Sequence, residues 1–159
     1  MLTDLVIFSG AGRPALRAST KGDYGVRALI ELALHYGEGP MQSAEIAARQ
    51  RIPEPYLDHL LTSLRRAGFI RSIRGPQGGH ELVREPAQVH MDEVIEALEG
   101  SLSPSACLDE ASPCSKAGGC PQRPMWQEVY DATKEILHRT TLADLAARVR
   151  QPAGGRYYI

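Results

Sequence analysis

The sequence predicts a mainly α-helical fold with one small β-hairpin, in which several short helices precede a long C-terminal helix. Two observations support this class. Apolar residues recur every three or four positions through most of the chain, which is the spacing of amphipathic helices. Residues 69–83 alternate instead between apolar and polar side chains around a turn rich in glycine, which is typical of a hairpin.

The composition indicates one small globular unit with appendages. The chain has 159 residues, 43% of them apolar, and a net charge of −1, so any polyanion-binding surface must be a local patch. No apolar run approaches the length of a membrane span, and no basic residue precedes the apolar start, so we expect a cytoplasmic protein without a signal peptide. We predict a flexible arm (residues 1–18), a compact domain (19–100), a cysteine-rich loop (101–123), a long helix (124–150) and a disordered tail (151–159).

The compact domain begins with two predicted helices. Ser19 or Thr20 can cap the first helix, and Gly37 is expected to end it. Ser43 is expected to cap a short second helix over residues 44–50, because a serine hydroxyl at that position can accept from the first free amides.

A third helix follows a tight turn and ends at Gly68. Pro53 or Pro55 suits its first turn, because no intrahelical donor is needed there. One side of this helix is polar, and the opposite side carries an apolar stripe formed by Leu57, Leu60, Leu61 and Leu64. A short helix, a turn and a polar-faced helix form a helix-turn-helix, and the hairpin after it makes this a winged helix.

The winged helix concentrates positive charge in a chain that is otherwise near neutral. Residues 61–84 contain five arginines and one acid, Glu81. Such a cluster can neutralise phosphates, so we predict that it binds double-stranded DNA with a strong salt dependence, the third helix lying in the major groove. The candidate DNA-binding residues are Tyr56, Asp58, His59, Thr62, Arg65, Arg66, Arg71, Arg74, Gly78 and Gly79. Taken alone, Arg65 and Arg66 would fit the solvated face of an ordinary surface helix better; the ordered set of short helix, turn, polar-faced helix and arginine-rich hairpin is what favours DNA binding.

All three cysteines of the chain, Cys107, Cys114 and Cys120, lie in the predicted loop, which follows a fourth helix that ends at Gly100. An odd number of clustered thiols fits a disulfide framework poorly and is more typical of a metal or redox site. Thiolates suit iron–sulphur clusters, zinc and Cu(I), although such sites usually take four ligands. Zinc is less favoured because the paired C-x₂₋₄-C spacing is missing, and three incidental surface cysteines are the plain alternative.

A long helix is predicted behind the cysteines. One of its faces carries Trp126, Val129, Tyr130, Thr133, Ile136 and Leu137 at helical spacing. We expect Trp126 to pack in a dimer interface or in the core. Thr140 or Thr141 can cap a final helical turn.

The segments STKGDYGVRALIELA and IPEPYLDHLLTSLRRAGFIRSIRGPQGGHEL, followed by the three-cysteine loop, resemble the Rrf2 type of bacterial winged-helix regulators. The resemblance covers about residues 16–149, and the RGPQGG hairpin and the cysteine spacing are its most specific parts. It implies a homodimer paired through the long helix and bound to a palindromic operator. It also implies that a cluster, where present, alters DNA affinity or site choice.

The resemblance also suggests a fourth cluster ligand. Some family members use a histidine three residues after the last cysteine to complete a [2Fe–2S] centre, and here that position is Arg123. Others recruit a carboxylate from the first helix of the partner subunit, a register that falls on Asp23. Three thiolates and a carboxylate favour [4Fe–4S], with [2Fe–2S] as the alternative. The plain explanation of Asp23 is an acid favoured by the helix dipole.

Together these features predict a homodimeric, DNA-binding transcriptional regulator that senses redox state, nitric oxide, iron or cluster supply through an iron–sulphur cluster. A metal-free regulator that responds by cysteine oxidation or partner binding is the main alternative. A protein-binding winged helix that never contacts nucleic acid is a further one. No nucleophile–base pair or phosphate-binding glycine motif stands out, so we do not predict an enzyme.

Overall fold

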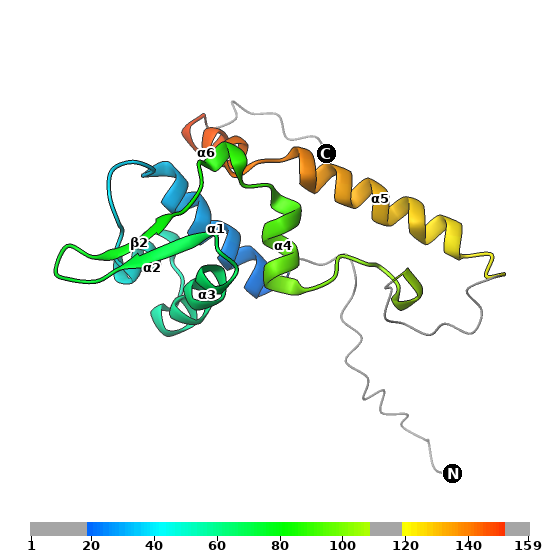
Figure 1. Ribbon diagram of the computed structural model, residues 1–159, viewed down its shortest axis with the longest axis horizontal. Coiled ribbons are helices and arrows are strands. Elements are labelled where there is room, and N and C mark those ends of the chain that lie inside the picture. The colour runs from blue at the N-terminus through cyan, green and yellow to red at the C-terminus, as the bar shows by residue number, and fades with distance from the viewer. Residues whose placement is uncertain (1–18, 109–118, 152–159) are drawn as a thin grey trace, which may run out of the picture.

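A computed structural model of the chain describes residues 19–108 and 119–151 (Figure 1). Within this part of the chain, six α-helices and an antiparallel two-stranded hairpin confirm the predicted fold class. The elements are α1 (Thr20–Leu34), α2 (Ser43–Gln50), α3 (Glu54–Arg66), β1 (Ile70–Ile73), β2 (Gly79–Leu82), η1 (Pro86–Gln88), α4 (Met91–Glu99), η2 (Ala106–Leu108), α5 (Arg123–Arg139) and α6 (Leu142–Arg150). The predicted arm, nearly all of the predicted tail and Cys114 lie outside the described residues.

Helix α1 forms the centre of the core. It packs against α2, α3, α4, α6 and β2, and its Ala28 and Leu29 are completely buried. The apolar stripe predicted for α3 is confirmed, since Leu57, Leu60, Leu61 and Leu64 are all buried. Helix α5 runs outward from this domain, with α4 as its main neighbour (Figure 1). None of the described helices has the length and apolar character to cross a bilayer.

The N-terminus of α1 is capped from two sides. As predicted, the Ser19 hydroxyl accepts hydrogen bonds from the amides of Lys21 and Gly22. The carboxylate of Glu99, at the end of α4, also accepts from the Gly22 amide (2.8 Å) and from the Ser19 hydroxyl. A Cβ on Gly22 would lie 2.5 Å from the carboxylate oxygen of Glu99, so a larger residue here would require the Glu99 side chain to move away from the helix start.

The predicted cap of α2 is wrong. Gln42 occupies the N-cap position and makes no side-chain capping bond, while Ser43 is the first helical residue. The Ser43 hydroxyl instead lies 3.2 Å from Nε2 of His80 in the hairpin. Because Ser43 stands one position inside the helix, its hydroxyl does not cap α2 and is free to make this tertiary contact.

The hairpin lies within the predicted range of residues 69–83, with β1 beginning one residue after the start of that range and β2 ending one residue before its end. Ile70 pairs with Leu82 at its base. At its tip the Gly78 amide donates to the Gly75 carbonyl (2.9 Å), and Gly75 has a φ of 117°, a conformation that disfavours other residues.

The end of α5 is fastened to the start of α4. His138 Nδ1 lies 2.9 Å from Asp92 Oδ2, and the imidazoles of His138 and His90 stack with centroids 4.6 Å apart. Thr141 then caps α6 through a capping box with Asp144, which confirms one of the two predicted caps. Because His90 and Thr141 also form a β-bridge, this junction fixes the direction in which α5 leaves the domain.

The Asp92–His138 bond predicts a specific pH dependence of stability. Burial alone would raise the pKa of Asp92, but the His138 hydrogen bond, the amides of Glu93 and Asp92 and the His138 charge outweigh it and hold this pKa below its ordinary value of 3.8. A lowered folded-state pKa stabilises the fold above the unfolded-state pKa, and the contribution disappears as pH falls through the folded value. We therefore expect Asp92→Asn to destabilise the protein near neutrality and the difference from wild type to vanish below the lowered pKa. Denaturant unfolding across this range, with Asp131→Asn as an exposed control, would measure it; a difference independent of pH would contradict it.

Candidate functional site

The outer face of α3 is open to solvent along its length. Asp58, His59, Arg65 and Arg66 are exposed and Thr62 is half-buried, so the polar side predicted from the sequence faces away from the core. The turn before α3 is tight because Arg51 adopts a left-handed conformation (φ 53°) and its amide donates back to α2. This arrangement of α2, turn and α3 is a helix-turn-helix with its second helix presented outward (Figure 1).

Tyr56, at the start of α3, is used partly for packing. Its ring meets that of Tyr24 edge-on, with centroids 5.8 Å apart. The guanidinium of Arg27 lies 5.2 Å from the Tyr24 ring centroid and donates to the Gln50 carbonyl at the end of α2. These contacts link α1 to both helices of the helix-turn-helix, and they leave about a third of Tyr56 exposed.

The arginines of the winged helix divide into two groups. Arg71 pairs with Glu81 across the hairpin (2.6 Å), and Arg84 pairs with Glu93 of α4 (2.7 Å). No salt bridge to Arg65, Arg66 or Arg74 is found among the described residues, and all three are exposed. The uncompensated positive charge is therefore concentrated at the C-terminal part of α3 and at the hairpin tip, while Arg84 faces α4.

The fold of the hairpin itself requires glycine at two of the candidate DNA-binding positions, Gly78 and Gly79. A Cβ on Gly78 would lie 2.1 Å from the Ile73 carbonyl oxygen, and one on Gly79 would lie 2.2 Å from the Met41 carbonyl oxygen. Either contact is shorter than any real Cβ contact, so a side chain would distort the hairpin itself. Close approach to DNA, the role predicted for them, would be additional to this requirement.

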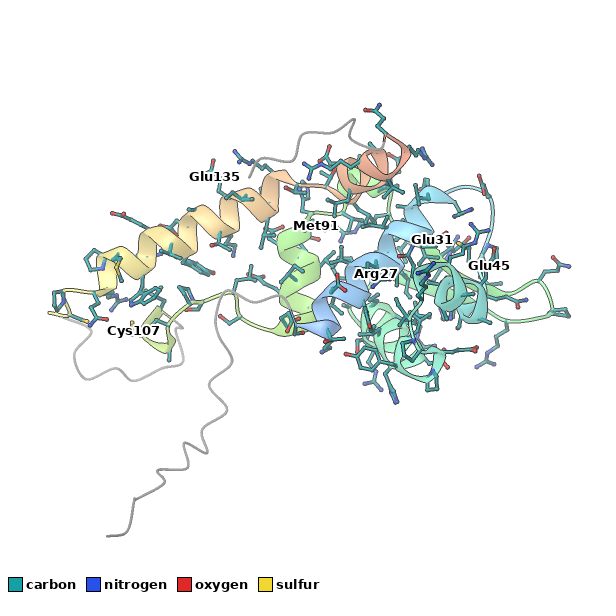
Figure 2. The ribbon with its side chains drawn as sticks, turned by 180° about the vertical axis from the view of Figure 1, so that it is seen from behind. Arg27, Glu31, Glu45, Met91, Cys107 and Glu135 are labelled. Atoms are coloured by element: carbon teal, nitrogen blue, oxygen red, sulfur yellow. The ribbon has the colours of Figure 1, made fainter. Side chains whose placement is uncertain are left out.

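A polar cluster between α1 and α2 was not predicted. The buried carboxylate of Glu31 accepts from Arg49 Nη1 (3.2 Å) and from Gln50 Nε2 (2.6 Å), and Arg49 also pairs with Glu45 (2.8 Å). Glu31 and Arg27 lie on α1 beside α2, which carries Glu45 (Figure 2). The only sequence signal is an acid within the apolar run of α1, which a periodicity argument treats as a solvent position.

Two of the three predicted thiol ligands fall in the described residues. Cys107, in η2, and Cys120, just before α5, are free and half-buried, and the Cys107 thiol lies 3.2 Å from the Ser105 hydroxyl. Figure 2 shows Cys107 beside the N-terminal part of α5, away from α2 and α3. Among the described residues, no three cysteine, histidine or acidic side chains come together as a metal site, and Cys114 lies outside them.

Asp23, the predicted fourth ligand, stands on the exposed side of the first turn of α1. Its carboxylate is 55% exposed and lies 3.5 Å from Arg27 Nη1, one helical turn further on. Within one chain α1 packs against the helices of the compact domain, whereas η2 packs against α5. The structure therefore does not bring Asp23 together with Cys107 of the same chain.

The predicted apolar face of α5 is only partly covered by the chain itself. Trp126, Val129, Tyr130, Thr133 and Leu137 are half-buried, with Leu137 against the core, while Ile136 is exposed. Met125, which the sequence argument did not include, is also exposed and lies eleven positions before Ile136, three turns along the helix. This helix contains no fully buried residue.

A helix-turn-helix with a charged, outward-facing second helix and a hairpin beside it defines a winged-helix DNA-binding transcriptional regulator. A model of the Rrf2 family, described as an iron-dependent transcriptional regulator, matches residues 18–148. The chain belongs to the Rrf2 family of transcriptional regulators.

Relatives of known name agree with this assignment. The chain is 41% identical to the regulator CymR of Bacillus subtilis over 132 residues, which cover 83% of this chain and 91% of CymR. It is 35% identical to IscR of Sodalis glossinidius, covering 83% of this chain and 79% of IscR. Among solved structures, it is similar to "T. potens IscR" with a TM-score of 0.71 and 38% identity, covering 90% of this chain and 95% of that one. These relatives are regulators, as predicted, and not enzymes.

Proposed function

We propose that this regulator acts as a homodimer that binds a palindromic operator and senses redox, nitric oxide or iron status through an iron–sulphur cluster. The observation that carries the proposal is the pairing of an outward-facing α3, which ends in two exposed arginines, with a free-thiol segment packed on α5. In this proposal α3 enters the major groove, with Tyr56, Asp58, His59 and Thr62 toward the bases and Arg65 and Arg66 toward the phosphates. Arg71 and Arg74 of the hairpin contact the adjacent backbone.

Dimer formation through α5 is supported by its open apolar face. Ile136 and Met125 are about half exposed, and a helix that projects from its domain with no buried residue has little stability alone. A second copy of α5 would cover these side chains together with the half-buried face from Trp126 to Leu137. Two copies related by a two-fold axis would present two α3 helices to two symmetric half-sites.

The donor set fits a cluster in its chemistry. Cys107 and Cys120 carry free thiols at the surface, where metal or sulphide can reach them, and Cys114 would supply a third thiolate. The Asp23 carboxylate is exposed, and among the described residues its ion pair is a long contact to Arg27, so a cluster bound by the partner subunit's cysteines could take it as a ligand at little cost. An iron–sulphur cluster held in this way would supply a site that reacts with oxidants or nitric oxide.

The packing of the chain could couple the cysteine segment to the two α3 helices of the proposed dimer. Cys107 lies in η2, which packs on α5, and the far end of α5 is fixed to α4 by the Asp92–His138 bond. A change in the cysteine segment that shifts the two α5 helices would therefore change the separation and angle of the two α3 helices. Half-site spacing is fixed by the DNA, so such a change would alter affinity.

The cluster-free alternative also has a specific observation in its favour. Cys107 and Cys120 are free and accessible, and the chain is 34% identical to a Staphylococcus aureus CymR whose structure is described as the oxidized form, with a TM-score of 0.65. In that case the cysteines would respond by direct oxidation, and no metal would be needed.

The first test is to purify the dimer without oxygen and record its absorption spectrum with iron and sulphide analysis. We expect broad charge-transfer absorption in the wild type, its loss in Cys107→Ala, and faster bleaching in air for Asp23→Ala, because a carboxylate ligand would be replaced by solvent. Glu54→Ala, which removes an exposed acid from the first turn of α3, is the matched control. A colourless wild type that also fails to take up iron and sulphide would refute the cluster and favour thiol oxidation.

A further inference from the structure

The hairpin has few packing contacts that could fix its direction. Of the apolar side chains on its strands, Ile70 and Leu82 at the base are buried, whereas Ile73 is 40% exposed and Val83, just beyond β2, is 50% exposed. Figure 1 shows the hairpin extending away from the helices. A two-stranded hairpin without a buried face is marginally stable, so its orientation must depend on other contacts.

A cavity of about 250 Å³, partly open to solvent, lies between the hairpin and the end of α1. It is bounded by Leu32, His35 and Tyr36 at the end of α1, by Met41, and by His80 and Val83 of the hairpin. Apart from Leu82, which is buried in the core, the hairpin is therefore not closely packed against this end of α1.

His80, which borders this cavity, joins the hairpin to the helices. Its Nε2 lies 3.2 Å from the Ser43 hydroxyl at the start of α2, and its Nδ1 lies 3.1 Å from the Ser72 hydroxyl on β1. Its backbone exchanges two hydrogen bonds with Met41, of 2.7 and 2.9 Å, which extends the sheet by one residue. The absent Cβ of Gly79 permits that approach. One side chain thus connects both strands of the hairpin to the helix that precedes the recognition helix.

We propose that His80 is the positioning residue of the wing: the Ser72 contact orients its ring within the hairpin, and the Ser43 contact holds the hairpin at the angle at which Arg71 and Arg74 reach the phosphates beside α3. This inference rests on the proposed DNA-binding face. His80 need not touch DNA; it acts through the direction of the hairpin. Ser43, the predicted cap of α2, contributes its hydroxyl to this positioning contact instead.

The position of His80 also links the wing to pH. Burial lowers the pKa of His80 from its ordinary value; the Asp58 charge raises it and the Arg65 charge lowers it. The Arg71–Glu81 pair and His35 also face it around the cavity. Both serine hydroxyls can accept, so the bridge survives protonation, and phosphates placed near the wing would favour the charged imidazole. DNA binding should then take up a proton, so affinity rises as pH falls through the pKa of His80.

The test compares His80→Phe, which keeps a ring but loses both contacts, with the double variant Ser43→Ala/Ser72→Ala, which keeps His80. The DNA probe is a duplex recovered from a random-sequence pool by selection with the wild-type full chain. We expect each variant to bind about tenfold more weakly and to lower the salt slope by about one, because one or two phosphate contacts are lost. Hydroxyl-radical protection next to each half-site should weaken, and protection from base-specific methylation in the major groove should persist.

Two further readouts separate positioning from folding. In the His80→Phe background the serine changes should have no additional effect, since the interactions they remove are already gone. The affinity gained by wild type over His80→Phe should be larger at low pH than at high pH. Unchanged salt slope and footprint in a folded His80→Phe protein would overturn the proposal, and so would a double serine variant that behaves as wild type. Should His80→Phe fail to fold, the serine variant decides alone. A wild type that enriches no duplex would instead refute DNA binding itself.

Discussion

Replacing Arg65 and Arg66 together with alanine is expected to reduce the affinity for duplex DNA by about 100-fold and the salt slope by about two, since each guanidinium releases about one counterion. Both side chains are exposed on the C-terminal half of α3, and neither is compensated by a carboxylate in the described part of the chain. Binding to non-specific duplex should fall by a similar factor, because phosphate contacts carry no sequence information.

The matched control is Arg139→Ala/Arg148→Ala, which removes the same total charge from exposed positions at the end of α5 and on α6. We expect less than a threefold effect on affinity from this pair, with the salt slope unchanged within error. Titrations of a labelled duplex at several salt concentrations measure both quantities. Equal effects of the two double variants would mean that net charge, and not the α3 face, determines binding.

The sequence predicts the helices well where a helix has a single apolar side, because the same side chains produce the periodic pattern and become buried. The stripe on α3 is buried because the only apolar side of a short amphipathic helix must face the core, and Gly100 ends α4 as the pattern requires. The arginines of the winged helix are predictable as a group for the same reason, since a solvated face must carry the charge.

Tertiary competition is what the sequence could not show. Ser43 has the residue type of a helix cap but lies one residue after the N-cap position, and its hydroxyl contacts the imidazole of His80, 37 positions away. Arg84 belongs to the same cluster in sequence as Arg74, but Glu93 and the Phe69 ring draw it toward α4. The periodic pattern also could not show whether the apolar face of α5 is covered within the chain; here Ile136 stays exposed, which is what the proposed dimer would require.

Glu31 illustrates the same limit and predicts the second large effect. An acid within an apolar run of α1 is expected at the surface, but here its side chain is 6% exposed. The cost of burying the carboxylate is offset by hydrogen bonds from Arg49 and Gln50 at the end of α2, immediately before the turn that leads to α3. Glu31, Arg49 and Gln50 therefore form a clamp that holds the helix-turn-helix against the central helix α1.

Glu31→Ala is expected to lower the free energy of unfolding by about 2 kcal/mol, because a cavity forms and the Gln50 amide loses its acceptor. The corresponding fall in Tm is about 6 °C for a chain of this size. Glu45→Ala is the matched control, since Glu45 pairs with the same Arg49 but its side chain is 46% exposed. An exposed helix pair contributes less than about 1 kcal/mol, so its Tm should change little.

Thermal and urea unfolding of the two variants, followed by DNA titration below their transitions, would test this prediction. If the clamp also sets the angle of α3, folded Glu31→Ala should bind its selected duplex more weakly, whereas Glu45→Ala should not. Equal stability of the two variants would show that Glu31 is tolerated in the core without holding α2. A destabilised Glu31→Ala with unchanged affinity would assign the clamp to folding alone, because the recognition helix would then keep its place by the packing of Leu57, Leu61 and Leu64 on α1 and α4.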